Sequence, residues 1–264
     1  MRTSRNESAG KGSSLRSKLS AGQLVAGIFS IIPAPELVEI AGLAGLDFIV
    51  IDREHGGCSR ESMTNMLRAA TSAEIYPVVR VKENSSAAIL EALDSGAAAV
   101  QIPQVGNKKE ALKACAAARF HPKGTRGLNP YVRSAGYSAR SKTEYVNTSN
   151  DDTAVIVQIE GTQGVRNLSE ILTVKEIDVI FLGPYDLSQS LGIPGQVDHP
   201  SVSERMGRVI DEAKQTGVVV GTFVDSSEKA AKWIEMGVRY ITISVDSGIF
   251  LNACRAIAQS LSFR

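Results

Sequence analysis

The chain has 264 residues and a formal net charge of +1, with 43% apolar and 22% charged residues. This balance supports a large buried core and excludes global disorder, and the near-zero charge offers no attraction for nucleic acid or a membrane surface. The sequence contains no apolar run long enough to cross a bilayer and no apolar signal segment at its start, so we expect a cytoplasmic protein. The three cysteines are widely spaced and form no CxxC pair, which argues against a disulfide framework and a zinc site.

The beginning of the chain is rich in Ser and Gly and carries a local excess of basic residues. Such a composition is typical of a solvated tail, which we prefer to a nucleic-acid-binding or targeting segment. We therefore predict a flexible tail over residues 1–13 and a single folded domain over residues 14–264.

From residue 14 onward, short apolar runs alternate with amphipathic segments. The runs predict strands over residues 23–31, 47–51, 76–81, 98–105, 154–160, 177–182, 218–224 and 240–245. The amphipathic segments predict a short first helix over 14–21 and further helices over 33–46, 59–74, 85–95, 107–120, 164–174, 201–216, 226–236 and 247–261. Ser59 is a suitable N-cap and Gly96 a suitable residue to close a helix.

Repeated strand–helix units with unbroken apolar strands favour a parallel sheet, and eight of them favour closure into a (β/α)8 TIM barrel. The main alternative is an open doubly wound sheet, but no GxGxxG follows the first strand and no P-loop is present. We therefore predict a single-domain barrel.

Residues 122–152 interrupt the alternation with three glycines and two prolines. The segment also carries Arg126, Arg133, Tyr137 and Arg140. A connection of this length inside a compact domain is usually functional or mobile, and that is our expectation for it.

Candidate site residues are those at the C-terminal ends of the predicted strands, where barrels of this kind carry their active sites. They are Asp52, Glu54 and His55, then Arg80, Gln101, Gln104, Gln158, Glu160 and Asp186.

Glu160 and Asp186 follow neighbouring strands, so their carboxylates are able to converge on one hard divalent cation. Two carboxylates with open positions suit Mg²⁺ or Mn²⁺. Solvated surface acids are the alternative. We expect Asp186 in a loop, because Gly183-Pro184 bounds the strand before it.

His55 lies three positions after Asp52, and an imidazole with a nearby carboxylate is a candidate general base near neutral pH. The alternative is a loop histidine bonded to neighbouring backbone. Arg80 ends an otherwise apolar strand and needs an anionic partner, which is either the substrate or Glu54 in a structural salt bridge.

Five motifs occur in an order that resembles the metal-dependent (class II) 2-oxo-acid aldolases, which include 4-hydroxy-2-oxo-heptanedioate aldolase and 2-dehydro-3-deoxyglucarate aldolase. They are DFIVIDREH over 47–55, PVVR over 77–80, PKGTRG over 122–127, VQIE over 157–160 and FLGPYDLS over 181–188. The resemblance covers nearly all of the chain after residue 14.

The resemblance implies a lyase that makes or breaks a C–C bond beside a pyruvate enolate. Glu160 and Asp186 would hold Mg²⁺ or Mn²⁺, with Co²⁺ as a further candidate, and Arg80 would stabilise the enolate oxygen. His55, oriented by Asp52, would take the proton from the 4-hydroxyl group.

The resemblance assigns secondary roles to three further residues. Glu54 would hold a water molecule on the metal and Gln158 would contact pyruvate, while backbone N–H groups near Tyr185 would bind the substrate carboxylate.

The resemblance also implies a homohexamer whose last helix packs on a neighbouring subunit. Residues at helical spacing supply an apolar face for it, namely Phe250, Leu251, Cys254, Ile257 and Ala258. The alternative is that they cover their own barrel.

Two positions depart from the family pattern and leave the substrate open. Arg53 replaces a small or neutral residue and brings a second cation beside the base, or recruits another substrate carboxylate. Tyr185 replaces a small residue and narrows the pocket.

Two other functions are compatible with this scaffold, a decarboxylase of oxaloacetate-like acids and a barrel that binds an oxo acid without catalysis. The sequence does not name the aldehyde, the metal or the pathway.

Overall fold

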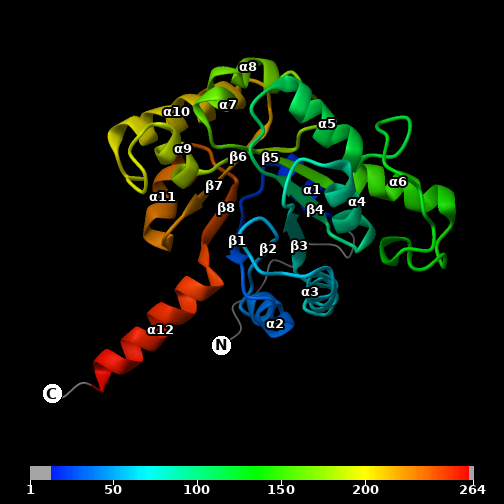
Figure 1. Ribbon diagram of the computed structural model, residues 1–264, viewed down its shortest axis with the longest axis horizontal. Helices are drawn as coiled ribbons and strands as arrows, with labels where there is room; N and C mark the ends of the chain where they lie inside the picture. Colours follow the sequence, from blue (N-terminus) through cyan, green and yellow to red (C-terminus); the bar gives the residue numbers. More distant parts are fainter. Residues whose placement is uncertain (1–12, 262–264) are drawn as a thin grey trace.

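Eight parallel strands close into a barrel in chain order, each hydrogen-bonded to the next and β8 to β1 (Figure 1). The computed structural model describes residues 13–261. The strands are β1 (Val25–Ser30), β2 (Phe48–Asp52), β3 (Tyr76–Arg80), β4 (Ala99–Ile102), β5 (Ala154–Ile159), β6 (Val179–Leu182), β7 (Val219–Val224) and β8 (Tyr240–Val245). The predicted (β/α)8 barrel is thus confirmed, and the open doubly wound sheet is wrong.

One helix precedes β1 and the others follow the strands, and apart from α12 they lie around the barrel. They are α1 (Leu15–Ser20), α2 (Pro35–Leu43), α3 (Arg60–Ser72), α4 (Ser86–Asp94), α5 (Lys108–Ala118), η1 (Arg133–Ala135), α6 (Lys142–Asp152), α7 (Thr162–Arg166), α8 (Leu168–Ile171), α9 (Pro184–Ser190), α10 (Pro200–Lys214), α11 (Ser227–Glu235) and α12 (Asp246–Ser260). Ser59 caps α3 by accepting the N–H of Ser62, as predicted, and Gly96 follows α4 with φ +104°, where a side chain would be strained.

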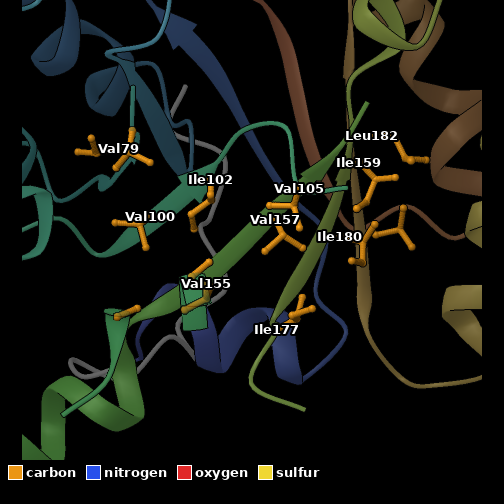
Figure 2. Packing of buried hydrophobic residues seen from close by; sticks show 14 of the residues in the cluster. Val79, Val100, Ile102, Val105, Val155, Val157, Ile159, Ile177, Ile180 and Leu182 are labelled. Atoms are coloured by element: carbon orange, nitrogen blue, oxygen red, sulfur yellow. The ribbon is translucent and has the colours of Figure 1, made fainter. Parts of the chain in front are cut away.

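The two-residue period of the strands sorts their side chains between two buried layers. Alternate residues such as Val50, Val78 and Ile156 fill the barrel interior. Those between them, including Val79, Val155 and Ile180, face the surrounding helices (Figure 2). At the C-terminal ends of the strands, the same alternation points polar side chains into the mouth of the barrel. The pattern that builds the core therefore also positions the candidate site.

The segment over residues 122–152 is more regular than predicted. It contains the short helix η1 and the α-helix α6, whose Tyr145 is buried against Phe120 with ring centroids 5.4 Å apart. Arg126, buried at 7% exposure, pairs with Asp94 of α4 at 2.7 Å. Neither helix was predicted, and the segment packs a small apolar cluster of its own.

Other boundaries also differ from prediction. The helix predicted over 164–174 is divided into α7 and α8, and the predicted loop after β6 is the helix α9. Pro184 lies in the first turn of α9, where its missing N–H costs no hydrogen bond.

The final helix, α12, extends away from the barrel (Figure 1). Asp246 at its start is buried, whereas its apolar residues are exposed, with Phe250 at 67% and Ile257 at 62%. The alternative that these residues cover their own barrel is therefore wrong.

Some predictions concern residues or properties that the structure tests only in part. Except for Ser13, the predicted tail lies outside the described residues. Residues 262–264 of the predicted domain also lie outside them. Between residues 13 and 261, no helix is long and apolar enough to cross a membrane. Cys58, Cys115 and Cys254 are all free thiols, half-buried, buried and exposed respectively.

Candidate active site

A cavity of about 540 Å³ opens at the C-terminal ends of the strands. Its lining brings together seven of the residues predicted from the sequence, from four strands and the segments that follow them. They are Asp52, His55, Arg80, Gln158, Glu160, Tyr185 and Asp186. Polar groups gathered at this end of a parallel barrel are typical of a barrel enzyme.

Arg80 and Asp52 form a two-point ion pair at the ends of adjacent strands. They occupy paired positions in β3 and β2, and Arg80 donates from Nε to Asp52 Oδ1 at 2.9 Å and from Nη2 to Oδ2 at 2.6 Å. Arg80 Nη1 lies 3.2 Å from Glu54 Oε2. Burial alone would lower the pKa of Arg80, but its hydrogen bonds with Asp52 and the charges of both acids outweigh burial and raise it. The guanidinium is thus held charged.

Asp52 organises the loop after β2 through its backbone. Oδ1 accepts the N–H of Glu54 at 2.9 Å and the N–H of His55 at 3.3 Å, while the side chain itself is 1% exposed. The imidazole of His55 faces Glu54 instead, with Nε2 3.9 Å from Glu54 Oε2. Asp52 thus holds the peptide segment that carries His55, and Glu54 is the acid beside the ring.

Glu54 is itself in a mixed environment. Burial raises its pKa, and the nearby charges of Arg80 and His55 oppose that rise. Its Oε1 accepts a hydrogen bond from Gln104 Nε2 at 3.3 Å. Glu54 therefore connects the loop after β2 with the loop after β4.

Glu160 and Asp186 both face the space beside Gly183. A Cβ built on Gly183 would lie 2.9 Å from Glu160 Oε2 and 3.9 Å from Asp186 Oδ2. Burial, followed by the charge of Asp186, raises the pKa of Glu160 to about 7. The buried carboxylate of Glu160 and the exposed carboxylate of Asp186 thus repel each other across one space, and such a pair is suited to a cation.

A chain of amides fixes the Glu160 carboxylate. Gln158 Nε2 donates to Glu160 Oε2 at 2.7 Å, and the amide of Gln101 donates in turn to Gln158 Oε1. The backbone N–H of Gln104 donates to Glu160 Oε1 at 2.7 Å from a residue with φ +55°. A positive φ is uncommon outside glycine, so Gln104 adopts a strained backbone conformation. This conformation directs its N–H toward the Glu160 carboxylate.

Gln158, predicted to contact pyruvate, is 1% exposed and engaged with Glu160 and Gln101. It lines the cavity from its inner end.

Tyr185 lies in the first turn of α9 and reaches across to the loop after β7. Its hydroxyl donates to Asp225 Oδ1 at 2.7 Å. This hydrogen bond, with burial, raises the pKa of Tyr185 to about 12. Tyr185 therefore stays a neutral donor, and it lines the cavity.

Arg53 points out of this site. Nη1 pairs with Glu91 Oε2 of α4 at 2.7 Å, and Arg53 lines a different cavity beside α3 and α4. The expectation that Arg53 adds a cation to the base or recruits a substrate carboxylate has no support in this geometry.

Several lining residues were not picked out from the sequence. Asp225 follows β7 as Asp186 follows β6, so the rule of a carboxylate after a strand end would have found it. That rule also finds Asp246 after β8, which is structural, since it accepts from Ser30 Oγ at 2.8 Å and the N–H of Ile32 at 3.1 Å. Phe29 and Phe223 gave no such signal, because aromatic residues in strands usually belong to the core.

Comparison with known proteins gives consistent matches along nearly the whole chain. A model of the HpcH/HpaI aldolase/citrate lyase family matches residues 26–253. The chain is 31% identical to the 5-keto-4-deoxy-D-glucarate aldolase of Enterobacter sp. (strain 638), covering 93% of this chain and 95% of that protein. It is 30% identical to the 4-hydroxy-2-oxo-heptane-1,7-dioate aldolase of Escherichia coli, covering 93% of each.

The structural comparison agrees. The crystal structure of an HpcH/HpaI aldolase/citrate lyase family protein from Burkholderia cenocepacia J2315 superposes with a TM-score of 0.89 at 33% identity, covering 94% of this chain and 98% of that one. The chain belongs to the HpcH/HpaI aldolase/citrate lyase family. This membership confirms the resemblance found in the sequence and supports the aldolase interpretation over the decarboxylase.

Proposed function

We propose that this protein is a divalent-metal-dependent aldolase that reversibly cleaves a 4-hydroxy-2-oxo acid into pyruvate and an aldehyde. The observation that carries the proposal is the convergence of Glu160 and Asp186 beside Gly183, in the same cavity as Arg80 and His55.

Glu160 and Asp186 would hold the metal. Carboxylate oxygens are the preferred ligands of Mg²⁺ and Mn²⁺, and no cluster of three or more His, Cys, Asp or Glu side chains suited to a metal occurs within residues 13–261. Two protein ligands leave positions for water and substrate oxygens. When bound, the cation supplies a Lewis acid that polarises the 2-oxo group and stabilises negative charge on its oxygen.

Arg80 would contribute fixed positive charge beside the developing enolate. Its pairing with Asp52 and Glu54 prevents the guanidinium from reorienting, so its field is preorganised rather than created during the reaction. Asp52 acts here as a positioning residue, because it holds Arg80 and the backbone of His55.

His55 would remove the proton from the 4-hydroxyl group. Its ring is 65% exposed on the rim of the cavity, where a substrate hydroxyl can reach it, and Glu54 lies beside it to stabilise the imidazolium. As the proton leaves the hydroxyl, the C3–C4 bond breaks, its electron pair forms the pyruvate enolate, and C4 departs as the aldehyde. The enolate then takes a proton at C3 to give pyruvate.

The exposed apolar face of α12 supports a homo-oligomer, for which we propose the hexamer implied by the resemblance. Phe250, Leu251 and Ile257 are 67%, 48% and 62% exposed on a helix that extends from the barrel. A second copy of the chain would cover them, since monomeric proteins rarely expose such contiguous apolar surface. The cytoplasmic location stays a prediction from the sequence.

The proposal is tested by measuring pyruvate release from several 4-hydroxy-2-oxo acids, and from oxaloacetate, with protein stripped by EDTA and then reloaded with Mg²⁺ or Mn²⁺. We expect metal-restored cleavage of the hydroxy acids. Release from oxaloacetate alone would instead identify a decarboxylase, and binding without turnover would identify a non-catalytic barrel.

A further inference from the structure

The cavity lining combines charged and aromatic side chains. Arg80, Glu160 and Asp186 are the charged residues of the proposed function. Beside them, four rings from β1, β6, α9 and β7 line the cavity, and the Arg80 guanidinium lies 4.7 Å from the centre of the first of these rings; they are Phe29, Phe181, Tyr185 and Phe223.

These four rings form one continuous aromatic wall. Ring centroids lie 6.2 Å apart for Phe29 and Phe181, 6.0 Å for Phe29 and Phe223, and 5.9 Å for Tyr185 and Phe223. Such spacing is that of packed aromatic pairs. The wall therefore presents apolar surface to the part of the substrate that the charged residues do not contact.

The polar group at the outer edge of this wall is an acid. Asp225 also lines the cavity, and its side chain is 40% exposed. One of its oxygens accepts the Tyr185 hydroxyl, and the other lies 3.4 Å from Lys229 Nζ. Lys229 is turned toward Asp198, which lies closer at 2.7 Å. The edge of the wall is thus acidic.

Cations available to a second substrate carboxylate are scarce. Among the described residues that line the cavity, Arg80 is the one permanent cation, and it is committed to Asp52 and Glu54. Arg53 pairs with Glu91 outside the cavity.

We propose that the aldehyde partner of pyruvate is uncharged, with an aliphatic or aromatic chain that lies along the aromatic wall, and that aldehydes ending in a carboxylate are disfavoured. This inference rests on the proposed function. A terminal carboxylate placed there would lose water without gaining a cation and would face Asp225. In the synthetic direction, C3 of the enolate bonds to the aldehyde carbon and the aldehyde oxygen takes one proton, so no other reactant is needed.

The test compares butanal with 4-oxobutanoate, which has a carboxylate in place of the terminal methyl group. Aldol addition to pyruvate is measured with the full-length, Mg²⁺-loaded protein. We expect kcat/KM for butanal to exceed that for 4-oxobutanoate by about tenfold or more, since one unfavourable charge contact of ~1.4 kcal/mol has that effect.

Two variants locate the cause of the preference. Asp225→Asn should raise kcat/KM for 4-oxobutanoate by roughly threefold to tenfold, because it removes the repelling charge. Phe223→Arg should shift the preference toward 4-oxobutanoate by placing a cation in the wall. Asp211→Asn is the matched control, because it removes an exposed acid of α10 that does not line the cavity, and it should leave the ratio of the two aldehydes unchanged.

Deuterium exchange at C3 of pyruvate, measured without an aldehyde, tests the proposed aldolase function separately from the aldehyde preference. If exchange occurs but 4-oxobutanoate is preferred, or neither aldehyde adds, the inference is overturned while enolate formation stands. If no metal-dependent exchange occurs, the proposed function and the inference both fail.

Discussion

The guanidinium of Arg80 ties the ends of β2 and β3 to the loop that carries His55. Its three interactions with Asp52 and Glu54 are as much structural as electrostatic. The alternation of side chains predicts that Arg80, Asp52 and Glu160 share the barrel interior. The hydrogen-bond partners of these side chains depend on the path of the loops. The spacing in the sequence therefore did not predict that Asp52 contacts the backbone of His55 rather than its imidazole ring.

Arg80→Ala should lower stability as well as activity. It leaves Asp52, which is 1% exposed, without its partner cation, and breaking a buried pair in this way costs about 3–5 kcal/mol. Urea unfolding measures the loss. Arg80→Lys keeps a positive charge and should lose less stability, and an unchanged midpoint in Arg80→Ala would contradict the structural role.

His55→Ala should separate two reactions of the same enolate. Loss of a positioned base typically reduces the rate about 10²–10⁴-fold, which we expect for cleavage of a 4-hydroxy-2-oxo acid. Oxaloacetate has no 4-hydroxyl group, so its decarboxylation should survive in His55→Ala. Rates of both reactions are measured in one preparation, and equal losses would show that His55 binds pyruvate or supports the metal site instead.

At the scale of elements, the turn from β6 into α9 brings the two acids together. Asp186 was expected in a loop because Gly183-Pro184 is a common turn signal. Proline is equally suited to a first helical turn, and the sequence alone did not distinguish these uses. The helix α6 within residues 122–152 was not predicted because it is polar and has no periodic apolar pattern, and its stability comes from tertiary contacts of Tyr145 and Asn150.

Gly183→Ala should weaken metal binding without unfolding the barrel. The added Cβ would lie 2.9 Å from Glu160 Oε2 and 3.1 Å from Glu160 Cβ, so the carboxylate must move. We expect Mn²⁺ affinity, measured by calorimetry, to fall roughly tenfold to a hundredfold, the usual effect of disturbing groups that orient a ligand. Gly127→Ala is the control, because its Cβ meets nothing within 4 Å. Equal Mn²⁺ affinity in the two variants would contradict the assignment of Glu160 as a metal ligand.

For the whole molecule, eight repeats of one pattern made barrel closure predictable, but the direction of α12 was not. From the sequence alone, its apolar face fits packing on its own barrel and packing on another copy of the chain equally well.

Phe250→Glu combined with Ile257→Glu should lower the mass measured by light scattering, because charges would be buried in the proposed contact between copies. Gln259→Glu on the same helix is the control. A wild-type monomer at micromolar concentration would contradict the assembly.

The most direct measurement of the central claim is exchange of the C3 protons of pyruvate in D₂O, followed by NMR. It reports enolate formation alone, whatever the aldehyde. We predict exchange in Mg²⁺- or Mn²⁺-loaded wild-type protein, its loss after EDTA treatment, its return when metal is restored, and its absence in Glu160→Gln with metal present. Full exchange in the EDTA-treated protein, or in metal-loaded Glu160→Gln, would contradict a metal-dependent enolate at this site.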